Sequence, residues 1–290
     1  MDLLTQLNRA MAYIEAHIDD DLALSDAAAV TGYSPYHFGR LFYYIAGMPL
    51  SEYIRKRKLT LAAEELKSGD VKVIDLAVKY GYDSADSFTR AFAKQHGITP
   101  TAARQPGVNL TIFLPLTFQI KIKGVHSMNW RIEEREAFEV FGIERMYKND
   151  ETELVPELWT ETKQNGEQEK LFAATGEIMP QSGEMPLKGI CGYCEPGDHI
   201  FPYMIGAFLT KKCKTESYKI FKIPKATWAV FRSESLPHFG IAIPELFNRA
   251  YSEWLPSSGY EKAIGPDMEI YKLDENGKSY EEVWIPVRKV

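Results

Sequence analysis

Two arginines, Arg40 and Arg90, occupy equivalent positions in a segment that occurs twice in the sequence. The first copy spans residues 24–49 and the second spans residues 73–100. The matched residues are Asp26 and Asp75, Ala28 and Ala77, Gly32 and Gly81, Tyr33 and Tyr82, Phe38 and Phe88, Arg40 and Arg90, Phe42 and Phe92, Gly47 and Gly97, and Pro49 and Pro100. An arginine at the exposed start of a helix can donate two hydrogen bonds to a guanine edge in the major groove. A single arginine is more often a solvated helix residue, but two at matched repeat positions favour DNA binding.

Each copy has the pattern of a helix, a tight turn and a second helix. A glycine suited to positive φ ends the first helix, at Gly32 or Gly81, and a serine that can cap the next helix follows at Ser34 or Ser84. In each second helix two phenylalanines lie four residues apart and so share one buried face. The sequence therefore predicts two helix-turn-helix units.

Two further helices flank these units, one over residues 3–18 and one over residues 51–68. The second connects the copies, and a rigid connection could hold two recognition helices about 34 Å apart, so that one monomer enters two successive major grooves. This connecting helix carries the basic run Arg55, Lys56, Arg57 and Lys58, which could contact phosphates, although such runs are more often simply solvated.

The span from Leu3 to Arg104 resembles the DNA-binding domain of AraC/XylS-family regulators, in the N-terminal position of the Rob-like subgroup. The motifs GYSPYHFGRLF and GYDSADSFTRAF resemble its recognition helices, and IRKRKLTLAAEEL resembles its connecting helix. The resemblance implies base reading at early recognition-helix positions, where Gly39, Ala85 and Asp86 depart from the usual long polar side chains. The second copy would therefore read mainly through Arg90 or contribute little specificity. The predicted DNA-binding residues are Ser34, Tyr36, Gly39, Arg40, Arg55, Arg57, Ala85, Asp86, Thr89 and Arg90.

The helical pattern breaks at residues 105–107, and the chain then alternates in strand fashion from Phe118. We expect an all-α DNA-binding domain over residues 1–107, a linker and connecting strand over 108–126, and an α+β domain with a mainly antiparallel sheet over 127–290. Its predicted strands are 131–144, 170–178, 187–195, 203–210, 226–232, 267–273 and 280–287, and its predicted helices are 151–164 and 243–255.

The segments KIPKATWAVFR, YSEWLPSSGYEKAIGPDMEIYKL and EEVWIPV resemble the GyrI-like small-molecule-binding domain. That resemblance implies two pseudo-symmetric β-α-β-β modules and a cleft with aromatic walls and a buried glutamate. Glu282 is the first candidate for this glutamate and Glu269 the second. The candidate wall residues are Tyr193, Phe201, Trp228, Trp254, Tyr260 and Trp284. Such a cleft would suit lipophilic or cationic molecules, whereas the alternative for any one aromatic residue is a place in the core.

Composition and motifs limit the other functions. The N-terminal residues do not resemble a signal peptide, and no apolar run is long enough for a membrane span, so we expect a cytoplasmic protein. The net charge of −6 means that any surface for nucleic acid must be local. Cys191 and Cys194, with Cys213 and His199 nearby, lack a fourth ligand at recognisable spacing, so reduced thiols are expected rather than zinc.

The sequence thus predicts a ligand-responsive transcription regulator, without cofactor or catalytic residues. Its partners would be double-stranded DNA, a small-molecule effector and RNA polymerase. Two alternatives stay open: a GyrI-like hydrolase that uses a cleft glutamate as general base, and a protein-interaction module tethered to DNA.

Overall fold

A computed structural model describes residues 3–19, 22, 24–118, 127–148, 154–193 and 200–290. The chain divides into two compact units, Met1–Ile120 and Lys121–Val290. The first unit is helical, and the second combines a sheet with three helices and short π and 3-10 turns, so the predicted multidomain class is confirmed. Among the described residues, no helix has the length and apolarity needed to cross a membrane.

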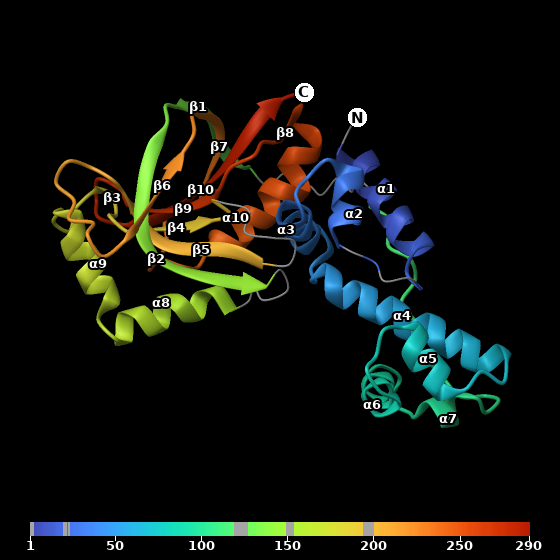
Figure 1. Cartoon of the computed structure of the whole chain (residues 1–290). Helices are drawn as coiled ribbons and strands as arrows, with labels where there is room; N and C mark the ends of the chain where they lie inside the picture. The colour runs from blue at the N-terminus through green and yellow to red at the C-terminus, as the bar shows by residue number, and fades with distance from the viewer. Residues whose placement is uncertain (1–2, 20–21, 23, 119–126, 149–153, 194–199) are drawn as a thin grey trace. The chain divides into compact units, whose positions relative to one another are not determined.

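The helical unit contains two helix-turn-helix motifs joined by a long helix. Its helices are α1 (Leu3–Ala16), α2 (Leu24–Thr31), α3 (Pro35–Ala46), α4 (Leu50–Ser68), α5 (Val73–Lys79), α6 (Ala85–His96) and α7 (Pro100–Ala103). Helices α1–α3 gather at the N-terminal end of α4, and α5–α7 gather at its C-terminal end (Figure 1). At 19 residues, α4 is about 28 Å long, compared with about 34 Å for one turn of B-DNA.

The turn chemistry of the two motifs is as predicted. Gly32 and Gly81 both have a φ of 77°, a left-handed conformation that glycine adopts without steric cost. Ser34 and Ser84 cap the helices that follow, each accepting a hydrogen bond from a backbone N–H three residues later. The paired phenylalanines are buried, as their spacing predicted: Phe38, Phe42, Phe88 and Phe92.

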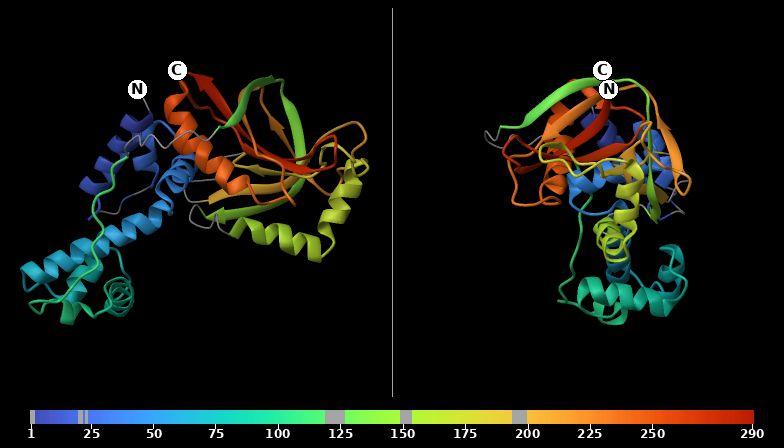
Figure 2. Two further views of the ribbon diagram at one scale, coloured as in Figure 1. Left: turned by 180° about the vertical axis from the view of Figure 1, so that it is seen from behind. Right: turned by 90° about the vertical axis from the view of Figure 1, so that its left-hand side faces the viewer.

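Residues 108–118 form an extended strap that lies along α4, visible in light green in Figure 2. The side chains of α4 and α1 satisfy its backbone: Lys67 Nζ donates to the Val108 carbonyl at 2.9 Å, and the Phe113 N–H donates to Thr60 Oγ1 at 3.1 Å. The predicted connecting strand is absent from residues 108–118, and the rest of it lies outside the described residues.

The second unit contains an antiparallel sheet with the strand order β1-β7-β10-β9-β4-β5-β2-β6, and short strands β3 and β8 pair with β9 and β10. The strands are β1 (Asn129–Arg135), β2 (Phe138–Lys148), β3 (Gly183–Glu184), β4 (Lys188–Cys191), β5 (Ile200–Phe208), β6 (Lys219–Ile223), β7 (Ala226–Arg232), β8 (Tyr260–Lys262), β9 (Asp267–Leu273) and β10 (Ser279–Lys289). The helices are α8 (Val155–Gln164), α9 (Glu167–Thr175) and α10 (Ile243–Arg249), the last continued by a π-turn over Ala250–Trp254.

The strand order shows two β-α-β-β modules. The first is β2, α8 with α9, β4 and β5, and the second is β7, α10, β9 and β10. They meet where β4 pairs with β9, and each receives an added edge strand, since β1 pairs with β7 and β6 pairs with β2. This is the modular arrangement that the sequence predicted.

The two faces of the sheet differ. One face, here called the helix face, contacts α8 through Tyr203 and the helical segment after α10 through Asp267. The other face, here called the inner face, is lined by an apolar cluster: Val140, Ile190, Met204, Ile223, Trp228, Val230, Met268, Ile270 and Trp284. Because side chains alternate along a strand, Glu269 and Glu282 lie on opposite faces.

Several secondary-structure predictions for the second unit were wrong. The predicted strand 170–178 is mostly α9, because the alternation of apolar residues there was too short to separate a strand from a helix. Residues 131–144 form two strands rather than one. Strand β6 was missed, since its burial pattern is mostly exposed at the sheet edge.

Candidate functional site

The first recognition helix, α3, holds its arginine close to the helix. Arg40 Nη1 donates to the Tyr36 hydroxyl at 3.0 Å, and the guanidinium lies 5.3 Å from the centre of the Tyr44 ring. Arg40 is 6% exposed and Tyr36 is 9% exposed, so the prediction that both side chains project into solvent is wrong. The reason is local, because residues one turn apart on a helix can contact each other. Gly39 lies between them, partly exposed.

The second recognition helix, α6, has the exposure that the sequence predicted. Asp86 and Arg90 are exposed, Ala85 and Thr89 are partly exposed, and Phe88 and Phe92 are completely buried. A capping box between Ser84 and Ser87 fixes the start of the helix. Arg90 is therefore presented from a well-defined helix on its exposed side.

The basic run on α4 divides into two kinds of residue. Arg55 is exposed, whereas Arg57 is buried and donates to both carboxylate oxygens of Glu15 on α1, at 2.7 to 3.1 Å. Arg57 also donates to the Phe113 carbonyl of the strap, and Tyr53 donates to Glu15 Oε1 at 2.5 Å. The prediction that Arg57 contacts phosphates is thus wrong, because its guanidinium is occupied by a carboxylate inside the unit.

In the second unit, Glu282 is buried on the inner face among cations. Arg131 Nη1 donates to it at 2.9 Å, Lys272 Nζ lies 2.9 Å away, and the Trp284 indole N–H donates at 3.0 Å. Burial would raise the pKa of Glu282, but the hydrogen bonds from these three residues outweigh it and lower the pKa. The carboxylate is therefore charged and already compensated.

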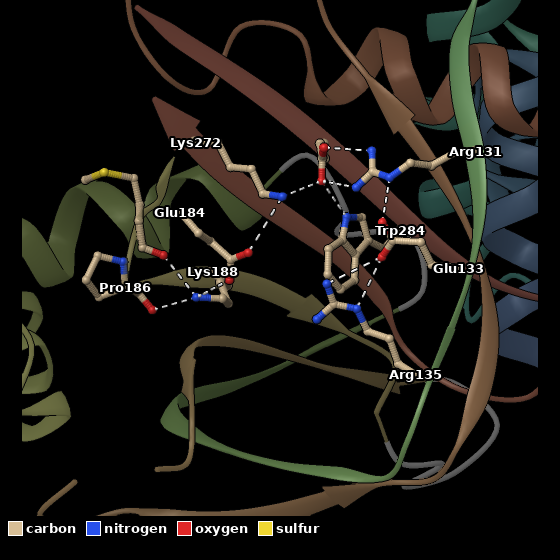
Figure 3. A network of polar contacts seen from close by, with 10 residues as sticks. Arg131, Glu133, Arg135, Glu184, Pro186, Lys188, Lys272 and Trp284 are labelled. Atoms are coloured by element: carbon tan, nitrogen blue, oxygen red, sulfur yellow. Dashed lines mark hydrogen bonds and ion pairs between the residues drawn. The ribbon is translucent and has the colours of Figure 1, made fainter. Parts of the chain in front are cut away.

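The cations around Glu282 belong to a longer network across the inner face. Figure 3 shows Lys272 also facing Glu184, which lies 3.1 Å from Lys188. On the other side the Arg135 guanidinium stacks on the Trp284 ring, 3.8 Å from its centre. The predicted neighbours Glu282 and Trp284 do lie together, but in a charge-paired network.

Glu269 lies on the helix face in a different environment. Its Oε2 accepts hydrogen bonds from the hydroxyls of Tyr203, at 2.8 Å, and Tyr271, at 2.9 Å. Trp159 of α8 donates its indole N–H to the Tyr203 hydroxyl at 2.8 Å. Burial and the nearby Glu269 charge raise the pKa of both tyrosines well above the usual range, so both remain neutral donors.

Aromatic rings surround this carboxylate. The rings of Trp159 and Phe239 each lie 5.5 Å from that of Tyr271, both in edge-to-face geometry. Tyr203 and Glu269 are buried, whereas Trp159 and Phe239 are half-buried, so exposure increases outward from the carboxylate. We call Glu269, Tyr203, Tyr271, Trp159 and Phe239 the Glu269 cluster.

Strand β4 makes room for the Glu269 cluster with a glycine. Gly189 pairs directly with Glu269 at the junction of the two modules. A Cβ at position 189 would lie 2.3 Å from Glu269 Oε2 and 2.4 Å from the Tyr203 hydroxyl, closer than atoms can approach. Only glycine at this position allows the carboxylate and the hydroxyl to meet.

The structure brings only three of the six predicted wall residues together. Trp228 and Trp284 lie on the inner face, where Tyr193 also packs against the apolar cluster. Phe201 stacks on Tyr147, and Trp254 stacks on Tyr260 beside Phe231. The prediction of one shared cleft wall is wrong, because ring type alone does not reveal the face on which a residue lies.

Four residues of the Glu269 cluster were missed. Tyr271 was within reach of sequence reasoning, since it lies two residues after Glu269 and so on the same face. Tyr203, Trp159 and Phe239 come from other elements, and no local pattern marks their approach to Glu269.

The cysteines provide no metal site among the residues that the structure describes, where no group of His, Cys, Asp or Glu is arranged to hold a metal ion. Cys191 is buried and Cys213 is half-buried. Cys194 and His199 lie outside the described residues.

Two helix-turn-helix units and a two-module sheet define a DNA-binding regulator with a small-molecule-binding unit. Residues 128–288 match the GyrI-like small molecule binding domain, and residues 27–106 match a helix-turn-helix domain. The chain belongs to the GyrI-like family and combines its domain with an AraC-type DNA-binding domain.

Several transcription regulators match about a third of the chain. The transcriptional activator AarP of Providencia stuartii is 41% identical over 98 residues, which cover 34% of this chain and 73% of AarP. The right origin-binding protein of Escherichia coli is 36% identical over 105 residues, which cover 36% of each protein. The solved structure of SAV2435 bound to tetraphenylphosphonium is 16% identical, with a TM-score of 0.44, and covers 56% of this chain and 94% of that one.

Arg55 and Arg57 provide a matched pair of substitutions on one helix. Arg57→Ala leaves the Glu15 carboxylate without its cation and should lower the free energy of unfolding by about 3 kcal/mol, the low end for a buried pair because the Glu15 side chain is 19% exposed. Arg55→Ala should change it by less than about 0.5 kcal/mol, as is usual for an exposed site. Urea unfolding followed by circular dichroism measures both, and equal destabilisation by the two would contradict the assigned role of Arg57.

Glu282 should make stability depend on pH. Its folded-state pKa is lowered, so its contribution is present at neutral pH and is lost as the pH falls through that pKa, below the usual value of about 4.3. Glu282→Gln should therefore be less stable than wild type at pH 7, with a gap that narrows in acid. Urea midpoints at several pH values test this, with the exposed Glu134→Gln as control; a gap independent of pH would refute it.

Proposed function

We propose that the helical unit binds an asymmetric DNA site as a monomer, with α3 and α6 in two successive major grooves. The observation that carries this proposal is the pair of capped recognition helices at the two ends of the single helix α4. Arg90 would read a base edge and the exposed Arg55 would contact a phosphate. Arg40 would first have to leave Tyr36 and Tyr44, which reduces its net contribution.

The second unit would bind a lipophilic cation at the Glu269 cluster. A buried carboxylate with aromatic rings nearby stabilises a positive charge, and the tyrosine hydroxyls hold the carboxylate in place. Glu269 is better suited to this role than Glu282, whose charge is already compensated by Arg131 and Lys272. Because Glu269 lies where the modules meet, a bound ligand would contact elements of both.

The site of action would be the cytoplasm, and the regulator would act on transcription with RNA polymerase. The support comes from relatives that match about a third of the chain and whose names describe transcription regulators. On this proposal the chain has no catalytic residue, and Glu269 serves as a binding group.

Arg90→Ala should weaken specific DNA binding by about 1 to 3 kcal/mol, the usual value of a bidentate arginine–guanine contact. The loss of binding free energy in Arg40→Ala should be about 1 kcal/mol smaller than in Arg90→Ala, because wild-type Arg40 gives up a hydrogen bond to Tyr36 when it contacts DNA. Gel-shift titrations on duplexes that wild type selects from a random library would measure both, with unrelated duplex as control. Unchanged affinity and sequence preference in both variants would exclude these helices from the grooves.

Glu269→Gln should remove most of the preference for an aryl trimethylammonium over its neutral tert-butyl isostere, because the amide keeps the shape but not the charge. Titration calorimetry with the two compounds measures the ratio of affinities. Glu282→Gln, the matched control, should keep the wild-type ratio. The reverse ranking would transfer the role to Glu282, and binding of neither compound by wild type would refute the cation site.

A further inference from the structure

The strap, residues 108–118, makes contact with both helix-turn-helix motifs. At one end Leu110 packs against the core of the second motif, which contains Phe88 and Phe92. At the other end the Phe118 ring meets the Phe42 ring of α3 edge-to-face, with centres 6.0 Å apart. At up to about 3.3 Å per residue, this segment can span about 36 Å, which is more than the length of α4, so it can follow that helix from end to end.

The strap is held by specific bonds as well as by apolar contact. The Asn8 side chain of α1 makes a pair of bonds to Phe118: its Oδ1 accepts from the backbone N–H at 2.8 Å and its Nδ2 donates to the carbonyl at 3.0 Å. The Leu116 N–H donates to the Tyr53 hydroxyl at 3.0 Å, and Thr60 Oγ1 accepts from Phe113. These side chains supply hydrogen bonds that a lone extended segment cannot make for itself.

The strap also contacts the buried ion pair between Arg57 and Glu15. Tyr53, which holds Leu116, donates to Glu15, and Arg57 joins Glu15 to the Phe113 carbonyl. A shift of the strap would therefore disturb the contact between α1 and α4. Its position is coupled to the packing of the first motif against the connecting helix.

We propose that the strap is a brace that sets the spacing at which the two recognition helices engage DNA, with Asn8 and Tyr53 as positioning residues. This inference rests on the proposed two-groove binding. A helix alone can bend, whereas a helix with a second segment fixed along its length resists changes in the distance between its ends. Neither Asn8 nor Tyr53 needs to contact DNA for this role.

The test uses full-length protein and duplexes in which the two groove contacts are separated by the selected spacing, or by one base pair more or fewer. Wild type should prefer the selected spacing by at least about tenfold, since a rigid monomer cannot follow both shifted sites. Asn8→Ala should reduce this preference to about twofold to threefold and speed hydrogen exchange at Phe118. Tyr53→Phe, a second variant, removes the bond to Leu116 together with the bond to Glu15 and should reduce the spacing preference as Asn8→Ala does. Asn109→Ala, an exposed substitution on the strap itself, is the matched control and should match wild type.

The outcomes separate the two proposals. If exchange at Phe118 speeds up in Asn8→Ala while the spacing preference stays at the wild-type value, the brace is refuted and two-groove binding stands. If wild type itself binds specifically but with no spacing preference, two-groove binding fails. A duplex carrying only one of the two groove contacts should bind wild type and Asn8→Ala equally, whereas equal losses on all duplexes would assign Asn8 to stability alone and refute the brace.

Discussion

The ion pair between Arg57 and Glu15 is the contact on which the helical unit depends. A guanidinium removed from water needs a carboxylate and further acceptors, and Arg57 finds them on α1 and in the strap. The pair therefore does more than join two charges. It fixes three segments that are distant in sequence, and it leaves Arg55 as the exposed cation of the same helix turn.

In the second unit, too, buried charged groups need partners, and two of its buried glutamates find different ones. Glu282 is buried among cations and donors on the inner face, so its charge is satisfied within the protein. Glu282 pairs with Ile270, the residue after Glu269, so Glu269 lies on the opposite side of the sheet. On this helix face Glu269 is buried among tyrosine hydroxyls. The alternation of side chains along antiparallel strands thus separates a structural carboxylate from one suited to binding. Gly189 is the residue that makes the second arrangement sterically possible.

The features that could be predicted from sequence are those encoded locally. The repeat, the turn glycines, the serine caps and the paired phenylalanines all lie within short windows, and the structure confirms them. Features that depend on contacts between distant segments could not be predicted. Arg57 and Arg55 look alike in the sequence, and only the approach of Glu15 distinguishes them. The partners of Glu269 likewise come from α8, β5 and the chain before α10, which no periodicity connects.

Each module's outer strand comes from a distant part of the sequence, since β1 pairs with β7 and β6 pairs with β2, and this has a consequence for folding. Strand β1 pairs with β7, which follows about a hundred residues later, whereas β2 next to β1 in sequence belongs to the first module. Contacts of such long range form slowly, because closing a large loop costs conformational entropy before the strand pairing can offset it. The helical unit, dominated by neighbouring helices, can fold while the ribosome is still producing the sheet. A nascent chain would thus have a formed DNA-binding unit before the sheet that carries Glu269 is complete.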